Sequence, residues 1–150
     1  MFYQTAIKSI PDVNVSGMDT TSTGHSVFYN MTHLDSVGNI TVGSGTSLRS
    51  LFQSSQKLQR VGYADVSLVR DMTSAFYSCR SLEWVDFSGY PVTVSFYDDF
   101  LSSGALKHIF DRLKDGVSGQ TIDIRNNYGA YELHADTIAI ATNKGWTVTT

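Results

Sequence analysis

The side chains that could do chemistry in this sequence are few and widely spaced. The four histidines lie far apart, with no HExxH pair and no cluster of cysteines beside them. Such spacing does not match the ligand sets of zinc sites, so we expect solvated histidines and no bound metal. The histidines are His25, His33, His108 and His134.

A nucleophile or an acid–base pair is equally hard to assign. Cys79 is the single cysteine, which excludes an intrachain disulfide, and its position in a sequence repeat suits a small buried residue. Asp98 and Asp99 are neighbours, and neighbours on a strand point to opposite faces, so a turn or a helix start fits them better than general acid–base chemistry. No phosphate-binding loop and no GxSxG elbow occurs. We therefore expect a protein that is not an enzyme and that uses no cofactor.

Composition and charge exclude further classes of function. The chain has 150 residues, with 11 Lys and Arg against 14 Asp and Glu, for a net charge of −3. It lacks the basic excess that non-specific nucleic-acid binding requires. No apolar run approaches the ~20 residues of a membrane span, so we expect no membrane insertion. The opening MFYQTAIKSIPDV is interrupted by polar residues, unlike a secretory signal, so we expect no Sec-type export.

A repeat with a period of 24 residues is the strongest pattern in the sequence. A phenylalanine recurs at each period, a leucine follows it by six residues, and a β-branched residue follows it by nine. Units this short cannot enclose their own apolar side chains, so each must stack on its neighbours, as in a solenoid. The three sets are Phe28, Phe52, Phe76 and Phe100; Leu34, Leu58, Leu82 and Leu106; and Val37, Val61, Val85 and Ile109.

The residues between these positions predict the secondary structure of each unit. The segments after each leucine are rich in β-branched and aromatic residues, which is typical of short strands. The segments before each phenylalanine carry apolar residues three or four apart, which indicates a turn of α-helix or 3₁₀ helix. We expect one parallel sheet from the segments after Leu34, Leu58 and Leu82, extended by 122–125 and 146–148.

The two ends of the chain depart from the repeat and are expected to cap it. Residues 105–114 and 135–143 have helical spacing, and residues 121–125 and 146–148 resemble strands, which predicts a strand–helix–strand closure. The chain is then a single domain, 1–150. Its parts are an N-terminal cap at 1–23, repeats at 24–113 and a C-terminal cap at 114–150.

A candidate binding surface follows from counting outward from the buried leucines and valines. One row on the open face of the strands holds Ser36, Arg60 and Trp84, with Lys107 as a candidate fourth member, and the next row holds Gly38, Gly62 and Asp86. An exposed Trp beside Arg and Asp has the composition of a binding hot spot, and solenoids often bind on such faces. Alternatively, Trp84 only covers apolar surface or contacts a neighbouring subunit. The candidate binding residues are therefore Ser36, Arg60, Trp84 and Asp86. The next candidates are the convex side and the loops around Tyr90 and 128–131.

The repeat unit also resembles a known family. Residues 75–88, AFYSCRSLEWVDFS, are similar to the bacterial leucine-rich repeats of BspA-like surface proteins, which place Ala-Phe, then Cys or Ser, then Leu at these offsets. The run LKHIFDRLKDGVSGQTIDIRNNYGA…ADTIAIATNKGWTVT is similar to the closing segment of such repeats in bacteriophage tail and virion proteins and in gut bacterial proteins. The resemblance covers about residues 24–150. The position of Cys79 holds Met31, Ser55 and Ser103 in the other units.

The resemblance implies an α/β leucine-rich-repeat solenoid of about four 24-residue repeats, capped at both ends. It implies a non-catalytic bacteriophage virion module, such as a tail-fibre, receptor-binding or particle decoration protein, that works through protein–protein or protein–glycan contact. The expected partners are other virion proteins or a host surface receptor, and a homo-oligomer stays open. The expected location is the virion, assembled in the host cytoplasm. The alternative is a BspA-like adhesin on a bacterial cell surface.

Overall fold

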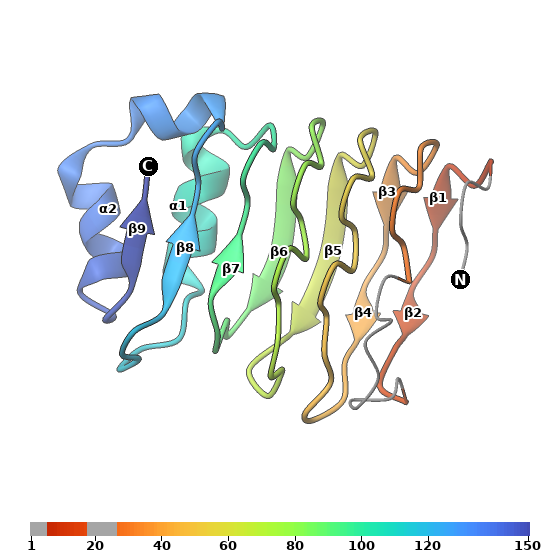
Figure 1. Ribbon diagram of the computed structural model, residues 1–150, viewed down its shortest axis with the longest axis horizontal. Coiled ribbons are helices and arrows are strands. Elements are labelled where there is room, and N and C mark those ends of the chain that lie inside the picture. The colour runs from red at the N-terminus through yellow and green to blue at the C-terminus, as the bar shows by residue number, and fades with distance from the viewer. Residues whose placement is uncertain (1–5, 18–26) are drawn as a thin grey trace.

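The computed structural model describes residues 6–17 and 27–150, and it has a mixed α/β fold in which every described strand pair is parallel. The strands are β1 (Ser9–Ile10), β2 (Val13–Asn14), β3 (Ser36–Val37), β4 (Ile40–Thr41), β5 (Arg60–Asp65), β6 (Trp84–Ser88), β7 (Val94–Ser95), β8 (Thr121–Asp123) and β9 (Thr147–Thr149). The helices are α1 (Ser103–Asp111), the 3₁₀ helix η1 (Tyr128–Glu132) and α2 (Ala135–Thr142). Figure 1 shows these elements following one another in chain order along the long axis, with α1, α2 and β9 at the opposite end from β1 and β2.

The central strands β3, β5 and β6 pair in the register of the sequence repeat. Val37 lies opposite Val61, and Val61 lies opposite Val85. All three valines are buried, and so are the leucines that precede them by three residues, which confirms the prediction for both sets. Because side chains alternate across a strand, the residues between these positions face outward. The leucines are Leu34, Leu58 and Leu82.

A column of phenylalanine rings runs through the core. The ring centroids of Phe28 and Phe52 are 5.3 Å apart, those of Phe52 and Phe76 are 5.8 Å apart, and each pair is stacked. The next ring on the column is Phe96, whose centroid is 5.0 Å from that of Phe76. The prediction that Phe100 continues the column is wrong, because this side chain is 51% exposed. Leu106 and Ile109 are buried as predicted, and they belong to α1, where the sequence predicts a helix over 105–114.

Backbone conformation explains why Phe96 takes the place expected of Phe100. Two residues after each column ring, the backbone turns through a left-handed conformation with positive φ. Asp98 follows Phe96 at this offset, so the turn that contains Phe96 is four residues shorter than the repeat period. Asn, Asp and Ser are short side chains whose oxygens bond the local backbone, and Asn and Asp are the residues that best tolerate this conformation after glycine. The four positions are Asn30 (φ 53°), Ser54 (φ 63°), Ser78 (φ 59°) and Asp98 (φ 61°).

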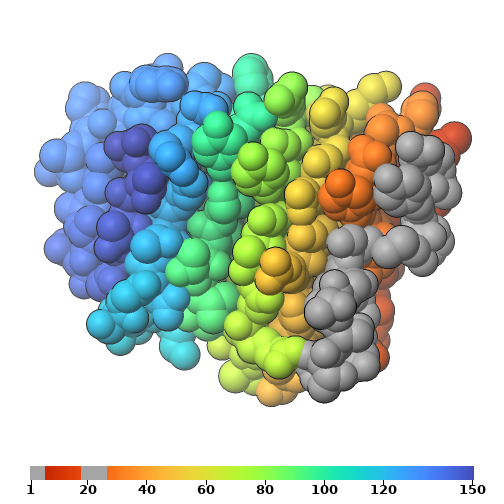
Figure 2. Space-filling view, in the orientation of Figure 1, coloured from red at the N-terminus to blue at the C-terminus, as the bar shows by residue number. Residues whose placement is uncertain are grey.

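The described strands form three sheets rather than the single sheet predicted. β1, β3, β5 and β6 make one sheet, β2 and β4 a second, and β7, β8 and β9 a third. The C-terminal strands therefore pair with β7 and do not extend the sheet that ends at β6. The reason is that the chain after Phe96 forms α1, which packs against β6 and offers no strand for the ladder to continue. Figure 2 shows successive segments of the chain as adjacent bands across the visible face.

Two further predictions concern the segments before the column rings and the N-terminal cap. The segments before Phe52 and Phe76 form turns, not helix or 3₁₀ helix, and they are joined by a bridge between Ser47 and Asp71. In the N-terminal cap, β1 pairs with β3 and β2 with β4, and Val15 is buried. The rest of that cap, residues 1–5 and 18–23, lies outside the described residues, as does His25.

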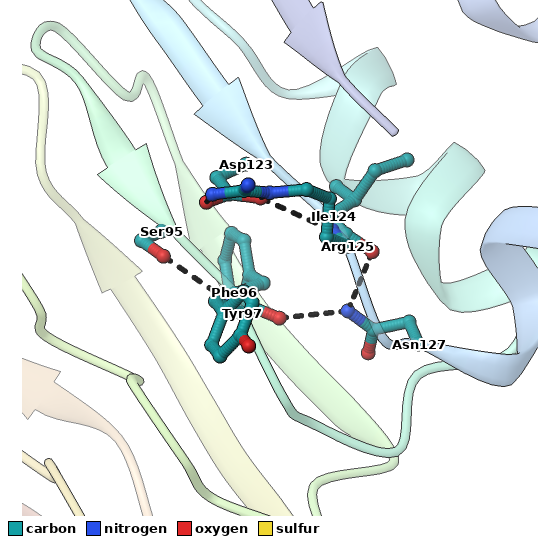
Figure 3. A network of polar contacts seen from close by, with 7 residues as sticks. All are labelled: Ser95, Phe96, Tyr97, Asp123, Ile124, Arg125 and Asn127. Atoms are coloured by element: carbon teal, nitrogen blue, oxygen red, sulfur yellow. Dashed lines mark hydrogen bonds and ion pairs between the residues drawn. The ribbon is translucent and has the colours of Figure 1, made fainter.

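A second column, of polar side chains, lies in the core beside the rings: Ser55, Cys79 and Asp99 follow Phe52, Phe76 and Phe96 by three residues, and Asn127 follows them in the last turn. The Ser55 hydroxyl donates to the Phe28 carbonyl at 2.7 Å, and the Cys79 thiol donates to the Phe52 carbonyl at 3.1 Å. Asn127 Nδ2 donates in the same way to the Phe96 carbonyl at 2.7 Å (Figure 3). Each of these side chains therefore bonds one turn of the chain to the turn before it. We call this set, together with Asp99, the polar column.

The C-terminal helices close the core as the helical spacing predicts. α1 begins after Ser102, whose Oγ accepts a hydrogen bond from the Ala105 N–H at 3.1 Å. At its other end, Lys144 Nζ donates to the carbonyl oxygens of Phe110 (3.2 Å), Asp111 (2.6 Å) and Leu113 (3.1 Å). One ammonium group thus bonds three carbonyls around the end of the helix, where a positive charge is favourable.

We expect Lys144→Met to lower the free energy of unfolding by about 2 kcal/mol, because hydrogen bonds from a charged donor each carry more than a neutral one. Denaturant melts at neutral pH would measure this change. Lys107→Met is the matched control, since Lys107 makes an exposed ion pair with Asp111 and should change stability by less than about 1 kcal/mol. Equal effects of the two substitutions would contradict a capping role for Lys144.

Candidate functional site

The predicted open face forms a shallow groove along β3, β5 and β6. Ser36 lies opposite Arg60, and Arg60 lies opposite Trp84, so the first predicted row is confirmed as a row. The groove encloses about 470 Å³, within the usual range for ligand sites of roughly 300–1,000 Å³. We call it the open-face groove. Its lining is Ile10, Ser36, Val37, Gly38, Asn39, Arg60, Val61, Gly62, Tyr63, Trp84 and Asp86.

The second predicted row is different, because β5 has an irregularity in the middle. The register between β5 and β6 shifts after Val61, so that Asp86 lies opposite Tyr63 and not opposite Gly62. The Tyr63 side chain is 48% exposed, and the Tyr63 N–H donates to Asn39 Oδ1 at 3.0 Å. The second row of the open-face groove is therefore Asn39, Tyr63 and Asp86.

Gly38 and Gly62 lie between the two rows and leave the floor of the groove without side chains. A Cβ placed on Gly62 would lie 2.6 Å from the Gly38 carbonyl carbon, which no real side chain tolerates. Gly62 is therefore required for the close approach of β5 to its neighbour.

Trp84 is less exposed than predicted, because α1 covers one side of it. Its ring centroid is 4.1 Å from that of His108, and the Trp84 side chain is half-buried against the core. Lys107, the candidate fourth member of the first row, lies on α1 and is bonded to Asp111, so the prediction for Lys107 is wrong. The helix turns His108 toward the groove instead.

Asp86 is held in a polar cluster at the end of the groove. Its Oδ1 lies 3.0 Å from His108 Nε2 and 3.2 Å from an Arg112 guanidinium nitrogen. Arg112 also lies 3.1 Å from His108 Nδ1. Three side chains from β6 and α1 thus fix one another's orientation. Sequence reasoning missed His108 and Arg112, although their spacing of four residues puts them on one face of a helix.

The other titratable candidates do not form a catalytic arrangement. Cys79 is fully buried, and burial raises the pKa of its thiol well above the usual range. That shift disfavours the thiolate, so Cys79 is not an activated nucleophile. Asp98 bonds Arg80 at 2.8 Å, while Asp99 is buried in the polar column, so the two carboxyl groups have separate environments. Among residues 6–17 and 27–150, no three His, Cys, Asp or Glu side chains gather as a metal site requires.

A second surface carries several exposed aromatic side chains near the C-terminal end. Tyr97 stacks on Tyr77 with ring centroids 5.3 Å apart, and the Arg125 guanidinium lies 5.4 Å from the centroid of the Tyr97 ring. Arg125 is in turn paired with Asp123 at 2.8 Å, as Figure 3 shows. Of the loops predicted as alternatives, 128–131 contributes here, since Tyr131 is 83% exposed. Tyr90 does not contribute, because it is fully buried.

Comparisons with known proteins identified no relative of this chain. No family model, no curated protein and no solved structure matches it. Among the helices that the structure describes, none is long and apolar enough to cross a membrane. The conclusion about function therefore depends on the geometry of the open-face groove and on the resemblance of the repeat unit.

Proposed function

We propose that this chain is a non-enzymatic binding module of a bacteriophage virion, and that its turns form a leucine-rich-repeat solenoid. In this proposal the module is a tail-fibre, receptor-binding or decoration protein. The open-face groove contacts a host surface or a neighbouring virion protein. The resemblance of residues 75–88 and of the closing segment to repeats in virion proteins supports the virion context.

Three regularities support the solenoid. The rings of Phe28, Phe52 and Phe76 stack in one column, and the polar column links successive turns at fixed offsets. β3, β5 and β6 pair in parallel. These are the nearest-neighbour contacts through which a solenoid gains its stability.

The observation that carries the proposal is the contrast between the two faces of β5 and β6. One face is buried in the core through Val61, Val85 and Phe87, whereas the other carries Arg60 and Tyr63 in an open groove. Within the part of the chain that the structure describes, Arg60 has no ion pair. Arg, Tyr and Trp are the residue types that most often carry binding energy at interfaces.

The test is binding of the purified protein to host bacteria and to virus particles that lack it. We expect Arg60→Ala together with Tyr63→Ala to weaken binding at least about thirtyfold, the loss typical of truncated hot-spot anchors. Both side chains are exposed, so the melting temperature should change little. Trp84→Ala should also weaken binding, but it should lower the melting temperature because His108 loses its ring contact.

The matched control replaces the same residue types outside the groove. Arg70 and Tyr131 are both exposed and do not line the groove, so Arg70→Ala with Tyr131→Ala should bind as the wild type does. Unchanged binding by a folded groove variant would contradict the proposal. Loss of binding in the control variant alone would place the contact on the aromatic surface near Tyr97 instead.

A further inference from the structure

We infer that the open-face groove binds a saccharide, an inference that rests on the proposed function and names the ligand of the same surface. A saccharide offers many hydroxyl groups, each both donor and acceptor, together with an apolar face of C–H groups. Its site must therefore combine fixed acceptors, fixed donors and an aromatic surface. The groove supplies all three within about 470 Å³.

The fixed acceptor is Asp86. His108 and Arg112 both bond its Oδ1, at 3.0 Å and 3.2 Å. Among the described residues no side chain or backbone group bonds its Oδ2, and this atom is not one of the buried unpaired ones. The carboxylate is therefore oriented before any ligand arrives, with one oxygen left to accept a hydroxyl proton. Such preorganisation lowers the entropy cost of binding, and the charge strengthens the hydrogen bond.

The fixed donors come from Arg60 and Asn39. Arg60 lies between Ser36 and Trp84 in the first row, and its planar guanidinium can donate to two adjacent oxygens at once. Asn39 is held by its neighbours on both sides, because its Oδ1 accepts from the Tyr63 N–H, its own N–H donates to Asp12 Oδ1 at 2.8 Å, and its Nδ2 donates to Asp12 Oδ2 at 3.4 Å. One of the two Nδ2 hydrogens remains for a ligand. Arg60 lies on β5 and Asn39 lies between β3 and β4, so the sheet sets the spacing of the two groups across the groove.

The aromatic surface comes from Trp84 and Tyr63, one in each row. Trp84 is braced by His108 and still lines the groove, while Tyr63 is 48% exposed. Between the rows, Gly38 and Gly62 contribute backbone and no side chain to the lining of the groove. A sugar ring can then place its C–H face on an aromatic side chain and its hydroxyls toward Asp86 and Arg60.

Two other classes of ligand fit this surface less well. A nucleic acid requires several cations along its backbone, and among residues 6–17 and 27–150 the lining contains one Lys or Arg, Arg60. An extended peptide adds to the free edge of a sheet, whereas this groove lies on the face of strands whose backbone groups are already paired.

The experiment uses the purified protein and an array of defined oligosaccharides: neutral hexose, N-acetylhexosamine and uronic-acid oligomers. We expect at least one class to bind. The bound oligosaccharide should shift the NMR signal of the Trp84 indole N–H, assigned with Trp84→Phe. Titration calorimetry should show at least tenfold weaker binding for Arg60→Ala and for Asp86→Asn. Arg70→Ala and Tyr131→Ala should bind as the wild type does.

The outcomes separate this inference from the proposed function. A folded protein that binds no oligosaccharide at millimolar concentration overturns the inference, and so does saccharide binding that Arg60→Ala and Asp86→Asn leave unchanged. Suppose that no oligosaccharide binds, but that the double variant Arg60→Ala with Tyr63→Ala loses binding to cells or particles. The proposed function then stands, and the partner of the groove is a protein. If the saccharide binds in the groove but neither cells nor particles are bound, the inference stands and the proposed function is wrong.

Discussion

Phe76→Ala should destabilise the protein by about 3–5 kcal/mol, the range for truncating a buried aromatic side chain. The Phe76 ring is fully buried and contacts three other rings, with centroids 5.8 Å away at Phe52, 5.0 Å at Phe96 and 5.4 Å at Phe87. Its loss would open a cavity in the middle of the column. Because each turn is stabilised by its neighbours, we expect the whole domain to unfold at lower denaturant concentration rather than one turn alone.

Phe100→Ala is the matched control for this prediction. The 24-residue spacing would put Phe100 in the column, but the ring is 51% exposed and contacts Tyr128 with centroids 4.8 Å apart. An exposed aromatic pair contributes about 0.5–1.5 kcal/mol. Urea melts should therefore separate the two substitutions clearly. A larger loss for Phe100→Ala than for Phe76→Ala would show that Phe96 does not hold the fourth place in the column.

The sequence contains a second signal that distinguishes Phe96 from Phe100. Three of the four column rings, Phe28, Phe76 and Phe96, are each followed by a tyrosine, whereas Phe100 is followed by Leu101. The small polar residue two positions after each ring does not separate the two candidates, because Ser102 follows Phe100 at that offset. Strict spacing therefore cannot find a turn that is four residues shorter, but the Phe-Tyr pair favours Phe96.

The sequence predicts the binding surface only through the alternation of side chains along the strands. Alternation along β5 and β6 placed Arg60 and Trp84 on the open face, and the structure puts them there. The register shift after Val61 was not predictable, because strict alternation along β5 pairs Gly62, and not Tyr63, with Asp86. The contact of His108 with Trp84 was not predictable either, because it depends on where α1 packs.

Protein stability should fall as the pH rises from about 4, because of Asp99. This carboxyl group is fully buried, and burial, opposed by a hydrogen bond from the Cys79 N–H and assisted by the charge of Asp98, raises its pKa well above 3.8. When the pH is above the pKa that Asp99 has in the unfolded chain, Asp99 is ionised in the unfolded state but still protonated in the folded state. The free energy of unfolding then falls by up to ~1.4 kcal/mol for each pH unit, until the pH passes the raised pKa of Asp99 in the folded protein.

The other members of the polar column indicate that a protonated Asp99 supplies a hydrogen-bond donor. Ser55 accepts from the Met31 N–H and donates to the Phe28 carbonyl, and Asn127 accepts from the Leu101 N–H and donates to the Phe96 carbonyl. Asp99 Oδ1 accepts from the Cys79 N–H at 2.7 Å, but Oδ2 is buried without a partner. A carboxylate cannot donate, whereas a protonated Oδ2 supplies the donor that this place in the column uses elsewhere.

Asp99→Asn should therefore stabilise the protein at pH 7 and remove the fall in stability between pH 4 and neutrality. The amide has nearly the shape of the acid, and it can donate at any pH in the way that Asn127 does. The measurement is the free energy of unfolding from pH 4 to pH 8 for the wild type and the variant. Asp98→Asn is the control, because it removes only the smaller contribution that the Asp98 charge makes to the pKa of Asp99, so this variant should still lose stability as the pH rises, over a narrower pH range. A slope that Asp99→Asn leaves intact would mean that Asp99 is ionised in the folded protein, with its buried charge compensated by groups other than the Cys79 N–H.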